Sequence, residues 1–154
     1  MSDITLTLER SIAAPPEAVW RVLTDLEAAP EVLSGVARVE RLAGAGYTIG
    51  TRWRETRTMM GREETEEMEV VGIDEGRSTM IAAEARGMAY RTEFTLDPTP
   101  EGTLLRMRFG GSLQSPSWVQ RVVARLTARL GTAMTRKMMQ QDLDDIATAA
   151  EAAR

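Results

Sequence analysis

The sequence predicts one α+β domain over residues 1–154, in which an antiparallel sheet of about seven strands packs against one long C-terminal helix. Three observations lead to this fold class. Apolar and polar residues alternate in several segments, the pattern of strands with one buried face. Turn residues separate these segments at intervals typical of hairpins. After residue 115 the apolar residues change to the three-to-four spacing of an amphipathic helix.

One strand and two short helices are expected before residue 36. Ile4, Leu6 and Leu8 alternate with polar residues, and the prolines of AAPP end this strand. Pro16 suits the first turn of a helix, because it lacks an N–H that would have no partner there. The apolar stripe of this helix continues to Leu26. A further proline and the Ser-Gly pair at 34–35 delimit a second short helix or turn.

Residues 52–72 read RWRETRTMMGREETEEMEVVG and pair as a hairpin if residues 60–61 form its turn. Trp53 then lies opposite Met68 on one face. The other face carries opposite charges in register, Arg52 with Glu69 and Arg54 with Glu67. Apolar pairs on one side and charge pairs on the other are typical of a sheet with one wet face.

Two further hairpins follow by the same reasoning. A turn at 86–87 places Ile81 opposite Thr92. A loop at 97–102, DPTPEG, places Phe94 opposite Leu105. In this register Thr92 faces Met107, Tyr90 faces Phe109, and Glu93 on the wet side faces Arg106. The segments together predict a long antiparallel meander.

The C-terminal helix is expected from about residue 116 to 150, a length of roughly 50 Å at 1.5 Å per residue. It carries two apolar stripes, Val119, Val122, Val123, Leu126 and Leu130 in the first, and Met139, Leu143, Ile146 and Ala150 in the second. The stripes are out of phase through Gly131, which predicts a kink or a change of register there.

The composition excludes several kinds of active site. The chain has no cysteine and no histidine, which removes thiolate nucleophiles, Ser-His-Asp triads and the usual zinc ligands. A net charge of −4 argues against a nucleic-acid partner. We expect no cofactor, no metal, no signal peptide and no membrane-spanning segment, and therefore a cytoplasmic location. A homodimer is left open.

Residues 12–42, IAAPPEAVWRVLTDLEAAPEVLSGVARVERL, resemble the opening of START-related helix-grip (SRPBCC) proteins, in particular their bacterial polyketide cyclase/dehydrase and lipid-transport branch. The matching positions are Ala14, Pro15, Glu17, Val19, Trp20, Asp25, Pro30, Gly35 and Val36. GTRWRETR at 50–57 and QQDLDDIATAAE at 140–151 are also similar. The resemblance implies the helix-grip fold, a curved antiparallel sheet wrapped around the long helix. Val32 and Leu33 depart from it, since the family often has an aromatic residue there.

The resemblance further implies a cavity for a hydrophobic small molecule between the sheet and the helix, with a filled core as the alternative. The expected ligand-binding side chains are Trp53, Met68, Ile81, Tyr90, Thr92, Phe94, Met107 and Phe109 from the sheet, and Leu130 and Met134 from the helix. Such a surface is apolar and adaptable at its methionines.

Glu55 and Tyr90 are the candidate catalytic residues. The predicted register places Glu55 opposite Glu66 and Arg57 opposite Glu64, near the tip of the first hairpin. Two facing carboxylates would raise one pKa, whereas the arginine would lower both. Because long hairpin tips are usually exposed, we expect this group to be solvated on both faces. Glu55, next to Trp53 on the inner face, is the best candidate for an inward charge.

Three functions agree with these observations. The first is binding or transport of a lipid- or polyketide-like molecule in the cavity. The second is a polyketide cyclase or dehydratase, in which Glu55 would move a proton and the Tyr90 hydroxyl would steady an enolate oxygen. The third is a protein-interaction module with a filled core. The residues do not define a complete set of catalytic groups, so we favour the first function.

Overall fold

The computed structural model describes the backbone of residues 4–59, 61–85, 88–113 and 118–153, and side chains within these ranges except at 4, 85, 88, 112–113 and 118–131. The elements in chain order are β1 (Ile4–Ile12), α1 (Pro16–Thr24), α2 (Ala29–Val32), β2 (Val36–Ala43), β3 (Arg52–Met59), β4 (Arg62–Asp74), β5 (Ser78–Ala85), β6 (Met88–Thr99), β7 (Gly102–Leu113) and α3 (Trp118–Ala152). The seven strands form one antiparallel sheet in the order β1-β7-β6-β5-β4-β3-β2. This confirms the predicted fold class.

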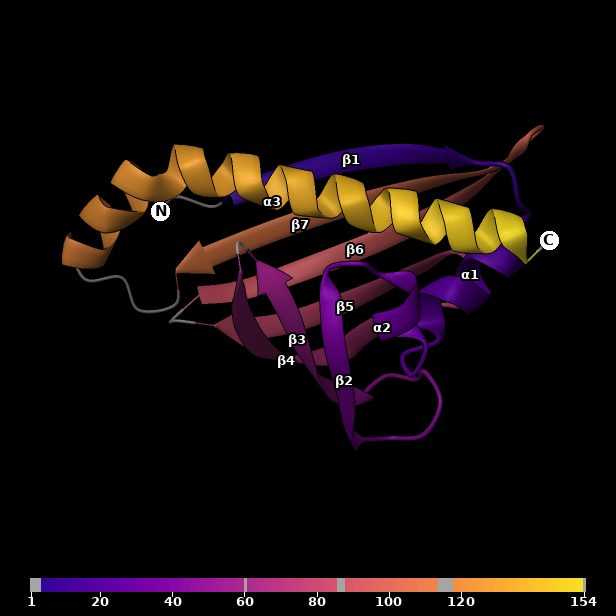
Figure 1. Ribbon diagram of the computed structural model, residues 1–154, viewed down its shortest axis with the longest axis horizontal. Coiled ribbons are helices and arrows are strands. Elements are labelled where there is room, and N and C mark those ends of the chain that lie inside the picture. The colour runs from indigo at the N-terminus through magenta and orange to yellow at the C-terminus, as the bar shows by residue number, and fades with distance from the viewer. Residues whose placement is uncertain (1–3, 60, 86–87, 114–117, 154) are drawn as a thin grey trace.

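The three helices lie on one side of the curved sheet. Figure 1 shows α3 running along the sheet, with α1 and α2 beside its C-terminal part. The strands β2 and β3 are steeply inclined to β6 and β7 in this view, so the sheet presents a concave face to the helices. The first part of α3, drawn in orange, lies at an angle to the rest, in agreement with the change of stripe expected near Gly131.

The main core joins the C-terminal half of α3 to the sheet and to α1. Met139, Leu143 and Ile146, from the second predicted stripe, are at most 3% exposed and belong to one cluster with Ile12 and Val19. Burial of each such side chain contributes about 1.5–3 kcal/mol. The core therefore holds one end of α3 against β1 and α1. Among the described residues, no helix is long and apolar enough to span a bilayer.

The first two hairpins have the predicted registers, including Trp53 opposite Met68 and Ile81 opposite Thr92. The third differs from its predicted register by two residues. Phe94 pairs with Met107 rather than Leu105, because the loop contains only residues 100–101. The observed pairs that replace the other predicted ones are Thr92 with Phe109, Tyr90 with Gly111 and Glu93 with Arg108.

The error at the third hairpin comes from Pro98, which the sequence pattern assigns to the loop but which lies in β6, opposite Thr103. The proline is tolerated because the ladder between β5 and β6 ends at Thr95, so one edge of β6 has no partner strand at this point. A shift of two residues leaves every side chain on its predicted face, since strand side chains alternate with a period of two.

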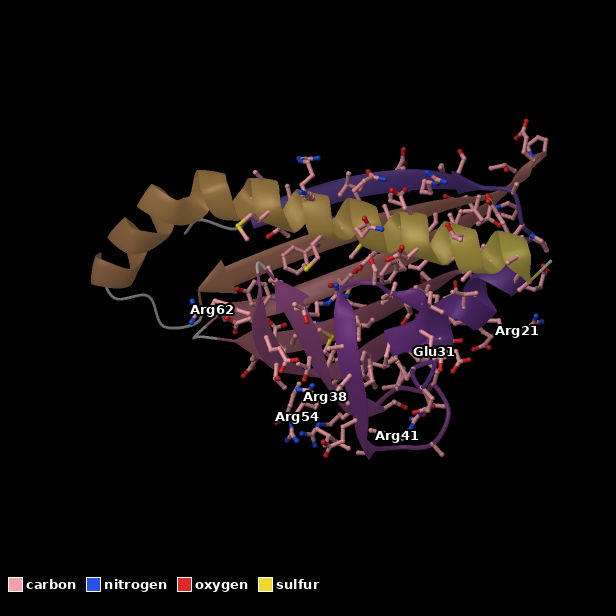
Figure 2. The ribbon with its side chains drawn as sticks, in the orientation of Figure 1. Arg21, Glu31, Arg38, Arg41, Arg54 and Arg62 are labelled. Atoms are coloured by element: carbon pink, nitrogen blue, oxygen red, sulfur yellow. The ribbon has the colours of Figure 1, made fainter. Side chains whose placement is uncertain are left out.

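The outer face of the sheet carries exposed ion pairs. Arg52 lies 2.9 Å from Glu67, and Arg106 lies 2.7 Å from Glu9 on β1 rather than opposite Glu93. Figure 2 shows Arg54 pointing away from α3, on the outer side of β3. The predicted wet side is therefore correct, although each exposed pair contributes only about 0.2–1 kcal/mol.

Candidate ligand cavity

A cavity of about 110 Å³, partly open to the outside, lies between the concave face of the sheet and the three helices. Its sheet side is formed by Tyr47, Trp53, Glu55, Arg57, Met68, Ile81, Thr92, Phe94 and Met107. Its helical side is formed by Val22, Leu23, Asp25, Leu26, Ala29, Val32, Leu33, Asp142 and Ile146. Most of these side chains are apolar, so the cavity offers a water-poor environment with a few polar groups.

Most of the sheet residues that were predicted to bind a ligand line this cavity. They are Trp53, Met68, Ile81, Thr92, Phe94 and Met107. Tyr90, Phe109 and Met134 are half-buried but do not line it. The rings of Tyr90 and Phe109 stack on each other with centroids 5.4 Å apart. The side chain of Leu130 lies outside the described residues.

The two candidate catalytic residues therefore have different surroundings. Glu55 borders the cavity and is 7% exposed, whereas Tyr90 is on the inner face of β6 beyond the lining residues. The expectation that Glu55 is solvated at the hairpin tip is wrong, because the inner side of β3 is covered at this point by α3. Its predicted register opposite Glu66 is confirmed.

A buried ionic cluster of three side chains covers one end of the cavity. The Arg57 Nε donates to Glu55 Oε2 at 2.8 Å. Its two terminal nitrogens donate to the two oxygens of Asp142 on α3, Nη1 at 3.1 Å and Nη2 at 2.8 Å. The Glu55, Arg57 and Asp142 side chains are only 8%, 16% and 6% exposed. We call these three residues the ionic cluster.

The charges of the ionic cluster are strongly coupled. Burial disfavours the charged guanidinium, but the attraction of Asp142 and Glu55 outweighs it, so the pKa of Arg57 is raised. Burial also raises the pKa of the Asp142 carboxyl; Arg57 opposes this shift, while Glu55 and Asp145 add to it. The guanidinium remains protonated and binds the Glu55 and Asp142 side chains inside the protein.

Sequence reasoning missed Asp142, although a signal for it exists. Residue 142 lies three positions after Met139 and four before Ile146, so it falls on the apolar stripe of α3. A charged residue within such a stripe must be buried with a partner. The sequence has no comparable signal for the cavity residues of α1 and α2, because their position depends on how these helices pack against the sheet.

Tyr47, also missed, is a further lining residue of the cavity. It stands in the loop between β2 and β3, and its hydroxyl lies 2.7 Å from the Thr79 hydroxyl. Its ring meets Trp20 edge to face, with centroids 6.4 Å apart. Burial raises the pKa of Tyr47 to about 12, although the hydrogen bond to Thr79 opposes the shift. Arg41 holds the loop by donating to the Gly46 carbonyl at 2.8 Å.

Tyr47 and Asp25 also border a second hollow, an open groove of about 1190 Å³ between α1, the β2–β3 loop and the ends of β4 to β6. These two residues therefore lie where the groove and the cavity adjoin. The part of the chain that the structure describes contains no group of three acidic side chains arranged to hold a metal ion.

The family is decided by a sequence comparison. The family model described as polyketide cyclase / dehydrase and lipid transport matches residues 3–151. The chain belongs to this family. No curated protein gives a significant match to the chain.

Several solved structures share the fold of this chain. TTHA0849 from Thermus thermophilus is 24% identical, with a TM-score of 0.80, and the match covers 97% of this chain and 99% of that one. The Zhui aromatase/cyclase from Streptomyces sp. R1128 is 17% identical, with a TM-score of 0.81 over 97% and 94% of the two chains. Ara h 8.0201 is 14% identical, with a TM-score of 0.70 over 98% and 99%. At these identities the similarity establishes the helix-grip fold.

Proposed function

We propose that this protein binds a hydrophobic small molecule, lipid- or polyketide-like in character, in the cavity between the sheet and the helices. The observation that carries the proposal is a partly open, mainly apolar cavity whose lining includes the ionic cluster. Apolar lining supplies affinity through the removal of hydrocarbon surface from water, and a few polar groups orient the ligand. The family description, which includes lipid transport, supports the same function.

The size of the cavity limits the ligand. About 110 Å³ is close to the roughly 150 Å³ of a cavity that holds one benzene molecule. One aromatic ring or a short branched chain therefore fits without rearrangement. A larger ligand requires part of the cavity wall to move outward. α2 has no buried residue, so its movement would disturb little of the core, whereas Val19 holds α1 in the core.

The first test is native mass spectrometry of freshly purified protein, followed by titration with an apolar fluorescent dye. A bound mass that is released on denaturation, or a saturable dye site, is expected. Thr92→Phe should fill part of the cavity and weaken dye binding, whereas Thr58→Phe on the exposed side of β3 should not. The thermal midpoint of each variant checks that it is folded. Absence of a saturable site in the wild type would contradict the proposal and favour an interaction module with a filled core.

A cyclase or dehydratase activity is the second candidate, and the burial of Glu55 in the cavity favours it. A carboxylate in such surroundings is a suitable proton carrier. The proposed partner Tyr90 lies beyond the lining residues, so its hydroxyl would act only on a ligand that extends past Thr92. Glu55→Gln should abolish turnover if the protein is this enzyme. Turnover that survives this substitution would exclude the role of Glu55.

A further inference from the structure

We infer that the ligand of this cavity carries a positive charge, as a hydrophobic amine does, and that the amine binds at Glu55. The inference rests on the proposed function and adds the chemical class of the ligand. It depends on three observations: the net charge of the ionic cluster, the hydrogen bonds from all three nitrogens of its guanidinium to carboxylates, and the charge of the groove outside.

The ionic cluster holds two carboxylates and one guanidinium, so it has an excess of one negative charge when all three groups are ionised. Asp145, on the next turn of α3, adds a further negative charge near Asp142, although it accepts hydrogen bonds from the Ser34 backbone N–H and hydroxyl. Of the other polar lining residues, Tyr47 and Thr92 are neutral at pH 7, and Asp25 is acidic. A buried negative excess is costly, and a cation that enters the cavity would offset it.

The guanidinium of Arg57 is already committed to the protein. Its Nε, Nη1 and Nη2 each donate to a carboxylate oxygen at 3.1 Å or less. An anionic ligand could use only the second N–H of Nη1 or Nη2, and it would then lie beside two carboxylates. Glu55, by contrast, can accept more hydrogen bonds: among the described residues, its Oε1 receives only a long bond of 3.5 Å, from the Trp53 indole N–H. A carboxylate has about four acceptor positions, so Glu55 can take a donor from a ligand.

The open groove beside the cavity also carries more negative than positive side chains. The groove is lined by six carboxylates, Glu17, Asp25, Glu27, Asp74, Glu75 and Asp97, and by three arginines. One of the arginines, Arg41, is paired with Glu27 at 2.7 Å. A groove with an excess of one sign of charge raises the local concentration of ligands of the opposite sign. A cation that approaches the junction at Tyr47 and Asp25 thus meets favourable charge both outside and inside.

The test uses three probes with one phenyl ring each, which fits the cavity: benzylamine, benzyl alcohol and benzoate. Binding is followed at pH 7 by the NMR resonance of the Trp53 indole N–H, which is hydrogen-bonded to Glu55. A Trp53→Phe variant assigns this resonance. Benzylamine should bind about tenfold or more tightly than benzyl alcohol, because hydrogen bonds to a charged partner are the stronger ones. Benzoate should bind more weakly than either.

Glu55→Gln keeps the shape of the side chain and removes its charge. It should reduce the preference for benzylamine over benzyl alcohol to about twofold or less, since the charge-assisted bond is lost. The control, Glu67→Gln, removes an equal charge from the exposed face of the adjacent strand β4 and should leave the preference unchanged.

The outcomes separate this inference from the proposed function. Benzyl alcohol or benzoate binding as tightly as benzylamine would overturn the inference while the cavity remained a ligand site. A preference for benzylamine that survives Glu55→Gln would also overturn it. Failure of all three probes and of the apolar dye would remove the proposed function together with the inference.

Discussion

Arg57 is the residue on which the interior charge of this protein depends, because it is the partner of both carboxylates in the ionic cluster. Arg57→Met would leave Glu55 and Asp142 facing each other without compensation. We expect a loss of about 3–5 kcal/mol in the free energy of unfolding, the usual cost of breaking a buried ion pair. Urea denaturation followed by tryptophan fluorescence measures it.

The control for this prediction is Arg54→Met, the same substitution on the outer face of β3. The exposed Arg54 lies 3.6 Å from Glu40 and 3.7 Å from Glu67, so its replacement should cost at most about 1 kcal/mol. Equal losses for the two variants would show that the guanidinium of Arg57 contributes no more than a surface charge.

Tyr47 gives the protein a pH dependence at the alkaline end. Its pKa is raised from 10.0 to about 12, so the neutral phenol stabilises the native state. This contribution is complete below pH 10 and is lost as the pH rises through about 12. Absorbance titration of phenolate should show one of the two tyrosines ionising near pH 12 in the folded protein. Tyr47→Phe should remove that step, and its persistence would assign the step to Tyr90.

At the scale of elements, the turn between β6 and β7 is constrained by the segment that follows β1. Gly102 has φ of 150°, and a Cβ there would overlap the carbonyl oxygen of Ile12 and the backbone of Ala14. Gly102→Ala should therefore destabilise the fold by clearly more than Gly76→Ala. Gly76 also has a positive φ, 77°, but it has open space around it, so its replacement should cost only about 1–2 kcal/mol of backbone strain. Similar losses in urea denaturation would mean that the β1 segment yields to the added methyl group.

The strands could be predicted better than the surroundings of the site. Alternation and cross-strand charge pairs such as Arg52 with Glu69 indicate which face of the sheet is exposed to water. This assignment is correct even where Pro98 causes a register error of two residues. The cavity-facing sheet residues follow from the same alternation. The docking of α1 and α2 does not, because it depends on tertiary packing. The prediction that Glu55 is solvated was wrong for the same reason, because α3, which carries Asp142, covers this side chain.

At the scale of the whole molecule, the core beneath the C-terminal half of α3 holds the two ends of the chain together. Leu143 is fully buried in the cluster that includes Leu6 of β1 and Val19 of α1. Leu143→Ala should cost about 2–5 kcal/mol through lost burial and a new void. Gln141→Ala, exposed on the same helix, should change stability by less than about 0.5 kcal/mol. Thermal and urea unfolding of both variants provide the comparison, and a small effect of Leu143→Ala would mean that the site collapses around the missing side chain.

The pairing of β1 with β7 has a consequence for how the protein is made. Ile4 pairs with Gly111, so β1 has no partner strand until β7, far along the chain, has been translated. The α3 residues that complete the core emerge later still. The meander from β2 to β7 can assemble hairpin by hairpin as it appears, because each strand pairs with the one just made. The first strand and the final helix then close the molecule as a late step, limited by the search over long sequence separations.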